Sequence, residues 1–428
     1  MKILNLKQLG FENVMDLVSS ARSKDSDVKA IVGPILDRVR NDGDTALFDF
    51  GEKFDGVKLS QLRVSKEEID FAYKEVDAEL FAAIKRAKRN IENFHFKSFV
   101  AKNAIVQTVP GVKVWREFRP IDKVGLYVPG GKAAYFSTVL MLAVPAVLAG
   151  CKEIIMCTPC SKEGKVNPMV LVAADLCGVK KIFKIGGAQA IAAMAYGTES
   201  VPKVYKIFGP GNQYVSTAKM MLYGEVDIDM PAGPSEVLVL ADNDANLKWI
   251  AADLLSQLEH GENSQAILVA FSAEFAKNVI DEMRLQMLSL ERLALIEKSF
   301  ERSFAIIVDD LDDAISVINE YAPEHLEIVI KKPESILAEI VNVGSIFLGP
   351  YSSEPLGDYA TGANHTLPTS AFAKMFSPLS VDSFGKMIQI QKVSKIGIEN
   401  LRDDVEKLAL AEGLYAHKNS VTIRFYDK

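Results

Sequence analysis

VGLYV at residues 124–128, followed by STVLMLAVPAVLAG at 137–150, sets the pattern that decides the fold of this chain. The short β-branched and aromatic run predicts a buried strand, and the longer apolar run predicts a helix. The pattern recurs three times, as EIIMC with MVLVAADLC (153–177), KIFKI with AQAIAAMAYG (181–197), and VYKIF with NQYVSTAKMMLYG (204–224). Strand–helix repeats at this spacing predict βαβ units and a parallel sheet covered on both faces.

Glycine-rich turns separate these strands from the helices that follow, at residues 129–131, 186–187 and 209–211. Glycine there lets the backbone approach a ligand, and the free N–H groups at the start of a helix favour an anion. Three such turns on one sheet edge favour a crevice for a phosphorylated cofactor. No G-x-G-x-x-G motif is present, however, and ordinary turn chemistry explains the glycines equally well.

The chain has 428 residues, of which 49% are hydrophobic and 25% charged. This length and hydrophobic content are sufficient for the hydrophobic cores of two or more domains. A net charge of -7 and a pI near 5.5 make nucleic acid an unexpected partner. The first residues lack the apolar core of a secretory signal, so we expect a cytoplasmic protein. Residues 133–151 carry no charge, but strand patterns flank them, and we expect a buried helix and no membrane partner.

Residues 1 to about 120 show amphipathic helical spacing. After the turn-rich segment IDMPAGPSEVLVLAD (228–242), the α/β pattern resumes. Its strand candidates are Val237–Leu240, AILVAF (266–271), FAIIVDD (304–310), LEIVI (326–330) and SIFLG (345–349). From about residue 381 a tail follows, with a helix over 400–413 that Gly413 ends.

Four of the five histidines lie in polar clusters in the second half of the chain. They are His260, His325, His365 and His417, and Gln257, Glu324, Asp358 and Glu412 stand near them. Imidazole beside carboxylate or amide groups is typical of metal sites and proton-transfer sites. His95 lies between Phe94 and Phe96, and we expect it to be a packing residue.

Gln257 and His260 are three residues apart in a segment with helical spacing, so we expect both side chains on one helix face. The spacing is similar to the two-histidine helix of metalloproteases, although glutamine is an uncommon zinc ligand and a plain helix surface also explains it. Asp358, expected in a glycine-rich loop, could complete a nitrogen and oxygen ligand set. The absence of a cysteine ligand would suit a catalytic ion.

Glu324 and His325 form the best candidate acid/base pair. They precede the predicted strand at 326–330, which would hold them at a sheet edge where active sites gather. A salt-bridged loop is the plainer alternative.

Cys151, Cys157, Cys160 and Cys177 all lie within the predicted parallel-sheet region. Cys157 and Cys160 have C-x-x-C spacing, but no second pair completes a zinc site and no thioredoxin pattern surrounds them. We expect small buried side chains.

The chain resembles the histidinol dehydrogenase family over nearly its full length. The segments that carry the resemblance are IDMPAGPSEVLVLAD (228–242) through DLLSQLEHGENSQA (253–266), VGLYVPGG (124–131), IGGAQAIAAMAYGT (185–198), FGPGN (208–212), APEHLEI (322–328), GDYATGANHTLPT (357–369) and AHKNSVT (416–422). They follow one another in the family's order.

The resemblance implies an NAD-dependent, zinc-dependent enzyme that oxidises L-histidinol to L-histidine through L-histidinaldehyde with two NAD, in the last step of histidine biosynthesis. It implies one zinc per subunit, with the ligands Gln257, His260, Asp358 and His417. The last ligand would come from the partner subunit of a homodimer.

It further implies that Glu324 and His325 are the catalytic proton-transfer pair. The implied substrate contacts are Ser235, Gln257, His260, His325, Asp358, Glu412 and His417. The implied cofactor contacts are Tyr127, Gln189 and Asn212, which lie in or beside the glycine turns. A cysteine thiohemiacetal is a rival for the second oxidation, but all four cysteines lie in the predicted cofactor region.

The expected fold is α/β, with two incomplete Rossmann-like parallel-sheet domains and small N- and C-terminal extension segments. The division is expected to be an N-terminal extension (1–22), a discontinuous first domain with the metal and catalytic residues (23–122 and 236–380), an NAD-binding second domain (123–235) and a dimer-swapped tail (381–428). A zinc-dependent hydrolase of a small amide, with Glu324 as its base, and a non-catalytic metal or nucleotide binder remain alternatives.

Overall fold

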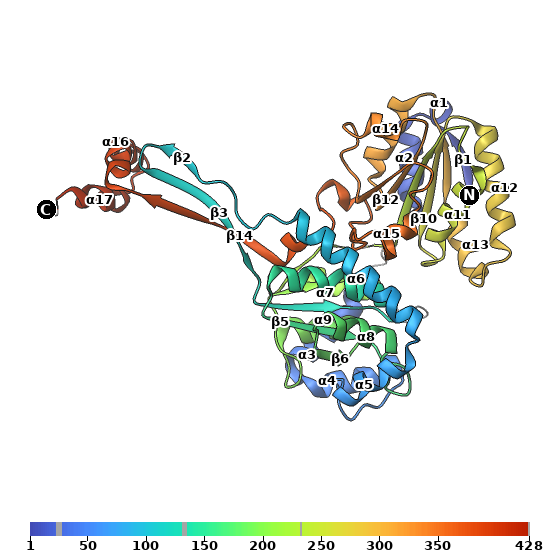
Figure 1. Cartoon of the computed structure of the whole chain (residues 1–428), viewed down its shortest axis with the longest axis horizontal. Coiled ribbons are helices and arrows are strands. Elements are labelled where there is room, and N and C mark those ends of the chain that lie inside the picture. Colours follow the sequence, from blue (N-terminus) through green and yellow to red (C-terminus); the bar gives the residue numbers. More distant parts are fainter. Residues whose placement is uncertain (23–27, 131–134, 232, 427–428) are drawn as a thin grey trace.

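The computed structural model describes residues 1–22, 28–130, 135–231 and 233–426. Its helices and strands form two α/β units and a long arm that stands away from both (Figure 1). One unit is built on a parallel sheet of six strands, the other on a parallel sheet of five, and the arm contains a three-stranded antiparallel sheet. The prediction of an α/β fold with two parallel-sheet domains is therefore confirmed.

The strand–helix repeats predicted for residues 124–224 form the five-stranded sheet. Its strand order is β6-β5-β4-β7-β8. The strands are β4 (Lys123–Tyr127), β5 (Glu153–Thr158), β6 (Lys181–Lys184), β7 (Lys206–Phe208) and β8 (Asp227–Ile228). The chain runs outward from β4 to β6 and then returns to the other side of β4 as β7. The carboxyl ends of β4 and β7 therefore form a switch point, where open α/β sheets bind their ligands.

Helices cover both faces of this sheet. One face carries α5 (Lys66–Glu75), α6 (Ala78–Ser98), α7 (Phe136–Ala149) and α8 (Pro168–Leu176). The other carries α3 (Lys29–Asp42), α4 (Asp44–Phe50) with the π-helix η1 (Gly51–Asp55), α9 (Gly187–Tyr196) and α10 (Gln213–Leu222). Helix α7 is buried, as predicted for the charge-free stretch, of which residues 133 and 134 lie outside the described residues. Within the described ranges, no helix has the length and apolar character needed to cross a membrane.

The six-stranded sheet has the order β1-β11-β10-β9-β12-β13. Its strands are β1 (Lys2–Asn5), β9 (Glu236–Ala241), β10 (Gln265–Ala270), β11 (Phe304–Ile307), β12 (His325–Val329) and β13 (Ser345–Leu348). The five strands predicted after residue 236 are all present. Every residue of β9 to β12 is buried, because helices pack on both faces.

The helices of this unit fall into two layers. On one face lie α11 (Leu247–Leu258), α12 (Ala273–Met287) and α13 (Leu293–Glu301). On the other lie α2 (Phe11–Ala21) and α14 (Leu311–Tyr321), with residues of α1 (Leu6–Leu9) and of the 3-10 helix η2 (Pro333–Ile336) in the same core. Shorter elements follow, namely α15 (Glu354–Tyr359) and the 3-10 helices η3 (Phe372–Lys374) and η4 (Val381–Phe384).

Two segments pack on a different sheet, or more closely with a sheet, than the predicted domain division implied. Residues 29–98, expected to belong with 236–380, cover the five-stranded sheet instead, where α3 packs on α9 and α10, α5 on α8, and α6 on α7. Residues 1–22, expected as a separate extension, add β1 to the edge of the six-stranded sheet beside β11. The physical reason is that amphipathic helices must bury their apolar stripes, and sequence order does not decide which sheet receives them.

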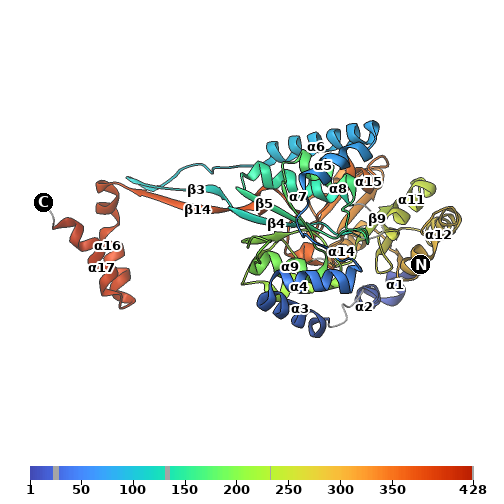
Figure 2. The same cartoon turned by 90° about the horizontal axis from the view of Figure 1, so that it is seen from below.

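The arm joins two segments that are far apart in the sequence. Its strands are β2 (Val106–Val109), β3 (Val112–Pro120) and β14 (Gly385–Val393), and β3 pairs with both of the others. At its tip lie α16 (Lys395–Ala411), α17 (Tyr415–Thr422) and the 3-10 helix η5 (Ile423–Phe425). Both views show these tip helices well away from the two units (Figures 1 and 2).

His95 is a packing residue, as predicted, and it makes stability depend on pH. It is 1% exposed in α6, and burial lowers the pKa of its imidazole to about 4 from the usual 6.5. Between these two values the unfolded chain binds a proton that the folded chain excludes, so His95 reduces stability as the pH falls, by about 3 kcal/mol at most.

We expect His95→Gln to weaken the acid sensitivity of folding. The thermal unfolding midpoints of the variant and the wild type should converge, or cross in favour of the variant, as the pH falls from 7 to 4. Curves that stay parallel over this range would show that His95 does not titrate in this way.

Candidate active site

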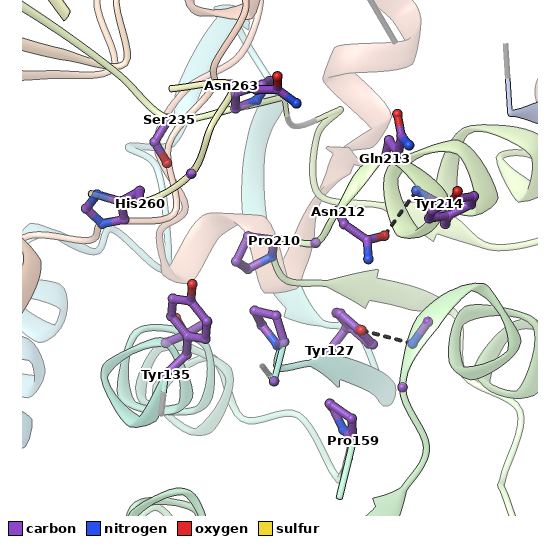
Figure 3. A pocket seen from close by; sticks show the side chains of 18 of the residues that line it. Tyr127, Tyr135, Pro159, Pro210, Asn212, Gln213, Tyr214, Ser235, His260 and Asn263 are labelled. Carbon is purple, nitrogen blue, oxygen red and sulfur yellow. Dashed lines mark hydrogen bonds between the residues drawn. The ribbon is translucent and has the colours of Figure 1, made fainter. Parts of the chain in front are cut away.

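A cavity of about 1290 Å³ is lined by residues of both α/β units. The five-stranded unit contributes the turns after β4, β5, β6 and β7, and the six-stranded unit contributes residues beside β9, α11 and β12 and within α15. Figure 3 shows His260 and Ser235 on one side of the cavity and Tyr214 on the other, with Pro210 and Asn212 between them. The cavity therefore connects the predicted cofactor turns with the histidine clusters.

The turn after β7 requires glycine at its first position. Gly209 has a φ of +121°, and a Cβ there would lie 2.0 Å from the carbonyl oxygen of Tyr127. Two charged side chains clamp the turn: Lys219 Nζ donates to the Gly209 carbonyl at 3.0 Å, and Asp229 Oδ2 accepts from the Gly209 N–H at 2.7 Å. Lys219 and Asp229 also form a buried ion pair with each other, so the turn is held firmly against the strand ends.

The three predicted cofactor residues all line the cavity. Tyr127 Oη accepts from the Gly187 N–H at 3.0 Å, which ties β4 to the start of α9. Asn212 caps α10, where its Oδ1 accepts from two N–H groups of the first turn at 3.1 and 3.2 Å. Gln189 is buried in the first turn of α9. Gly131, part of the first predicted turn, lies outside the described residues.

His325 is the first residue of β12, and its hydrogen bond defines its tautomer. Its Nδ1 lies 3.1 Å from the backbone carbonyl oxygen of Glu236. A carbonyl oxygen only accepts, so Nδ1 carries the proton and Nε2 is free to accept another. Burial lowers the pKa of His325 to about 4, and the imidazole is therefore neutral at neutral pH.

Glu324 lies next to this imidazole, with its Oε2 3.7 Å from His325 Nδ1. The same oxygen accepts from the backbone N–H of Glu236 at 2.9 Å. Burial, together with the carboxyl groups of Glu236, Asp358 and Glu354, raises the pKa of Glu324 well above its usual range. A carboxyl group in this setting changes its protonation readily when positive charge enters the cavity.

Gln257, His260 and Asp358 also line the cavity. Asp358 Oδ2 lies 3.9 Å from His260 Nε2, and Asp358 Oδ1 lies 3.9 Å from His325 Nε2. Gln257 has no exposed surface, yet within the described ranges neither polar atom of its amide has a hydrogen-bond partner. Buried amides are rarely left unsatisfied, and an amide, an imidazole and a carboxylate together suit a divalent cation such as zinc.

A second possible ligand group shares Asp358. The ligand atoms of His325, Glu354 and Asp358 lie within 4.8 Å of one another. Glu354 Oε1, like the Gln257 amide, has no hydrogen-bond partner within the described ranges, so an ion held with Asp358 could satisfy a buried polar atom in either group.

Comparison with known proteins gives a consistent result. Residues 18–425 match the family model described as histidinol dehydrogenase. A histidinol dehydrogenase of Bacteroides fragilis is 53% identical over 395 residues, which cover 92% of each chain, and one of Methanocaldococcus jannaschii is 45% identical over 424 residues, which cover 99% of each. The chain belongs to the histidinol dehydrogenase family.

A crystal structure of histidinol dehydrogenase from Elizabethkingia anophelis agrees closely with the fold. It superimposes with a TM-score of 0.95 at 45% identity and covers 100% of this chain and 98% of that one. As a histidinol dehydrogenase family member, the chain is an oxidoreductase.

Most residues implied by the histidinol dehydrogenase resemblance line one cavity. They are Tyr127, Gln189, Asn212, Ser235, Gln257, His260, Glu324, His325 and Asp358. Two local expectations need correction. Helix α11 ends at Leu258, so His260 lies beyond the helix and not on its face. Asp358 lies in α15 and not in a loop, since Pro355 in the first turn helps the helix to begin. Glu324 directly precedes β12 and His325 begins it, so the pair lies at the amino end of a buried strand, as predicted.

Glu412 and His417 do not line this cavity. They lie at the tip of the arm, Glu412 at the end of α16 and His417 within α17, and both are exposed. The structure of one chain therefore leaves two of the implied substrate contacts far from the others (Figure 1).

Sequence reasoning assigned no role to three residues that contact the site. Glu354 Oε1 lies 3.7 Å from His325 Nε2, and burial raises the pKa of Glu354 to about 9. His365 Nδ1 lies 3.1 Å from the backbone oxygen of Asp358. Glu236 joins Glu324 and His325 through its peptide groups. The sequence did offer signals for two of them. His365 stands in one of the polar histidine clusters, and the spacing of four between Glu354 and Asp358 places both on one face of a helix.

The unsatisfied amide of Gln257 gives a direct test of cation binding. Gln257→Leu removes a buried group without partners, so the metal-stripped variant should unfold at or above the wild-type temperature. The rise in unfolding temperature that zinc produces in the wild type should be lost.

Gln265→Leu is the matched control. Its amide is equally buried but bonds the carbonyl oxygens of Val18 and Arg302 and the Tyr321 hydroxyl. This variant should lose on the order of 2 kcal/mol with or without zinc. Equal destabilisation of both metal-stripped variants would show that the Gln257 amide is satisfied without an ion.

Proposed function

We propose that this protein oxidises L-histidinol to L-histidine through L-histidinaldehyde with two NAD, as a zinc-dependent enzyme of the last step of cytoplasmic histidine biosynthesis. One observation carries the proposal: a single cavity joins the glycine turns at the switch point of one parallel sheet to a neutral imidazole and a set of cation ligands from the other sheet. Family membership supports the substrate.

The proposed zinc ligands are Gln257, His260, Asp358 and His417 of the partner subunit. Zinc held by these residues would supply a fixed positive charge that helps to orient an amino alcohol and to stabilise developing negative charge. The proposed cofactor contacts are Tyr127, Gln189 and Asn212. NAD held by these residues would supply the hydride acceptor, and the N–H groups at the start of α10 would suit its negative charge.

His325 is the proposed base for the hydroxyl proton. Because Nδ1 carries the proton and donates to the Glu236 carbonyl, Nε2 faces the cavity without a proton. Its low pKa keeps it neutral, so it can accept the proton as the hydride departs. The carboxylate of Asp358, whose Oδ1 lies 3.9 Å from Nε2, would favour the imidazolium that results.

Glu324 is the proposed base that activates water for the second oxidation. Water adds to the aldehyde carbon and gives up one proton to the base. The resulting hydrate transfers its single C–H hydrogen as a hydride to the second NAD, and the carboxylic acid so formed loses a proton to give the carboxylate. Glu324 can accept the proton of water only when ionised, so its raised pKa has to fall once positive charge has entered the cavity. Ser235, directly before β9, is proposed to contact the substrate beside this pair.

A thiohemiacetal route receives little support. Cys157 and Cys177 are buried, and none of the four cysteines forms a disulfide. Cys160 alone among them lines the cavity, on the side of the cofactor turns, and burial raises the pKa of its thiol. The thiol form is a poor nucleophile.

A homodimer would complete the site. Glu412 and His417 are exposed at the tip of an arm that stands away from its own units, together with apolar side chains such as Leu408, Leu414 and Tyr415. Exposed apolar clusters of this kind mark contact surfaces. We infer that the arm delivers Glu412 and His417 to the cavity of the partner subunit.

The reaction is tested by counting NADH. We expect about two NADH for each L-histidinol consumed, with L-histidine as the product, and no NADH after zinc has been removed with a chelator. Activity should return when zinc is added. A zinc-loaded protein that forms no NADH but hydrolyses small amides would support the hydrolase alternative, and zinc binding without any turnover would indicate a binding protein.

Subunit exchange tests the shared site. Glu324→Gln and His417→Ala homodimers should each form almost no L-histidine, because each carries two incomplete sites. Mixed and refolded together, they should recover up to about a quarter of wild-type activity, since half of the dimers are hybrids with one intact site. A mixture as inactive as its parents would indicate that each chain completes its own site.

A further inference from the structure

The peptide groups of Glu236 contact both proton-transfer side chains at once. The backbone N–H of Glu236 donates to Glu324 Oε2 at 2.9 Å, and its carbonyl oxygen accepts from His325 Nδ1 at 3.1 Å. The two groups flank one Cα, so a rotation of this residue would displace the acid and the base together. The orientation of Glu236 therefore sets the position of Glu324 and the tautomer of His325.

The side chain of Glu236 is held by an ion pair behind the cavity. Glu236 is 2% exposed, and its Oε1 lies 3.0 Å from Arg22 Nε. Its Oε2 accepts from Arg22 Nη2 at 3.2 Å and from the backbone N–H of Ser370 at 3.3 Å. The pair therefore combines one hydrogen bond with a second close approach of opposite charges, because Arg22 Nε has no hydrogen-bond partner among the described residues. A guanidinium held on both oxygens of a carboxylate limits the direction of that carboxylate as well as its distance.

Arg22 is itself fixed by the six-stranded unit. Its Nη2 donates to the Tyr321 carbonyl at 2.6 Å, and its guanidinium lies 3.9 Å from the centre of the Tyr321 ring. The Tyr321 hydroxyl donates to Gln265 Oε1 at 2.8 Å. Arg22 directly follows α2, in the N-terminal segment that β1 anchors to the sheet edge.

A purely stabilising role is the plainer reading of this ion pair. Buried ion pairs seldom add net stability, however, because desolvation of both charges offsets their attraction. Here the pair holds the one residue whose peptide groups bond both Glu324 and His325. Positional control explains that placement, and stability alone does not.

We propose that Arg22 is a positioning residue for the reaction, which it serves by holding Glu236 so that its peptide groups align Glu324 and His325. The inference rests on the proposed function for the identity of the reaction. It gives the N-terminal segment a part in catalysis without any contact with substrate.

The test compares Arg22→Met with Arg22→Lys and with the matched control Arg302→Gln. Arg302 donates to the carbonyl oxygen of Ala21 at 3.3 Å, so it supports the same segment but from an exposed position away from Glu236. In zinc-loaded protein, the rate of the first NADH formed in a single turnover should fall at least 30-fold in Arg22→Met. KM for histidinol and for NAD should stay within about threefold of wild type. Arg22→Lys should recover part of the rate, and Arg302→Gln should match the wild type.

A second measurement separates positioning from the identity of the reaction. Crystal structures of the variants should show the His325 imidazole displaced from the Glu236 carbonyl in Arg22→Met and in place in Arg302→Gln. If Arg22→Met does not fold, Glu236→Gln, which keeps the peptide groups and the side-chain volume, should give the same loss of rate and the same displacement.

The positioning role is overturned if folded Arg22→Met or Glu236→Gln keeps the wild-type rate and an undisplaced imidazole. It is also overturned if Arg302→Gln loses as much rate as Arg22→Met. A wild-type protein that forms no NADH from histidinol would contradict the proposed function instead, and the imidazole position would then decide the positioning role.

Discussion

The burial of several carboxyl groups around one imidazole is the constraint on which this site depends. Glu324, Glu354 and Asp358 gather around His325, and the carboxyl group of Glu236 lies behind them. An ionised carboxylate removed from water costs several kcal/mol unless it is compensated. The chain compensates in two ways. A buried arginine pairs with Glu236 and partly offsets the burial that raises the pKa of Glu236 to about 7, and the raised pKa values of Glu324 and Glu354 favour their neutral forms. A divalent cation bound by Asp358 and the Gln257 amide would supply the remaining positive charge. The same cluster of carboxyl groups would then favour the binding of zinc and shift the pKa of Glu324.

The two sheets meet the cavity with opposite ends of their strands. The five-stranded sheet presents the carboxyl ends of its strands, where glycine turns and helix amino termini suit a dinucleotide. The six-stranded sheet presents the amino ends of β9 and β12. The first residues of these buried strands are held rigidly, because each strand is paired with its neighbours in the sheet. Rigid placement matters for proton and hydride transfer, because small misplacements of the reacting atoms slow both steps.

Under the proposed dimer, the two ends of the chain would both contribute to a cavity. The N-terminal segment adds a strand to one sheet and places Arg22 behind Glu236. The C-terminal segment forms an arm with residues 106–120 and carries Glu412 and His417 to its tip. In the proposed dimer, each cavity would therefore combine residues from both ends of the sequence.

The sequence alone determined the parallel sheets, the buried α7 and the turns at the switch point, because strand and helix periodicity and glycine chemistry are local properties. It also indicated a metal or proton-transfer site from Gln257, His260, Glu324 and Asp358, although the grouping of those residues rested on family resemblance. Only the tertiary structure decided that residues 29–98 cover the five-stranded sheet, that Glu236 joins the acid to the base, and that one chain separates His417 from its own cavity. These features depend on contacts between segments far apart in the chain, and such contacts are selected by packing and electrostatic compensation that no local pattern records.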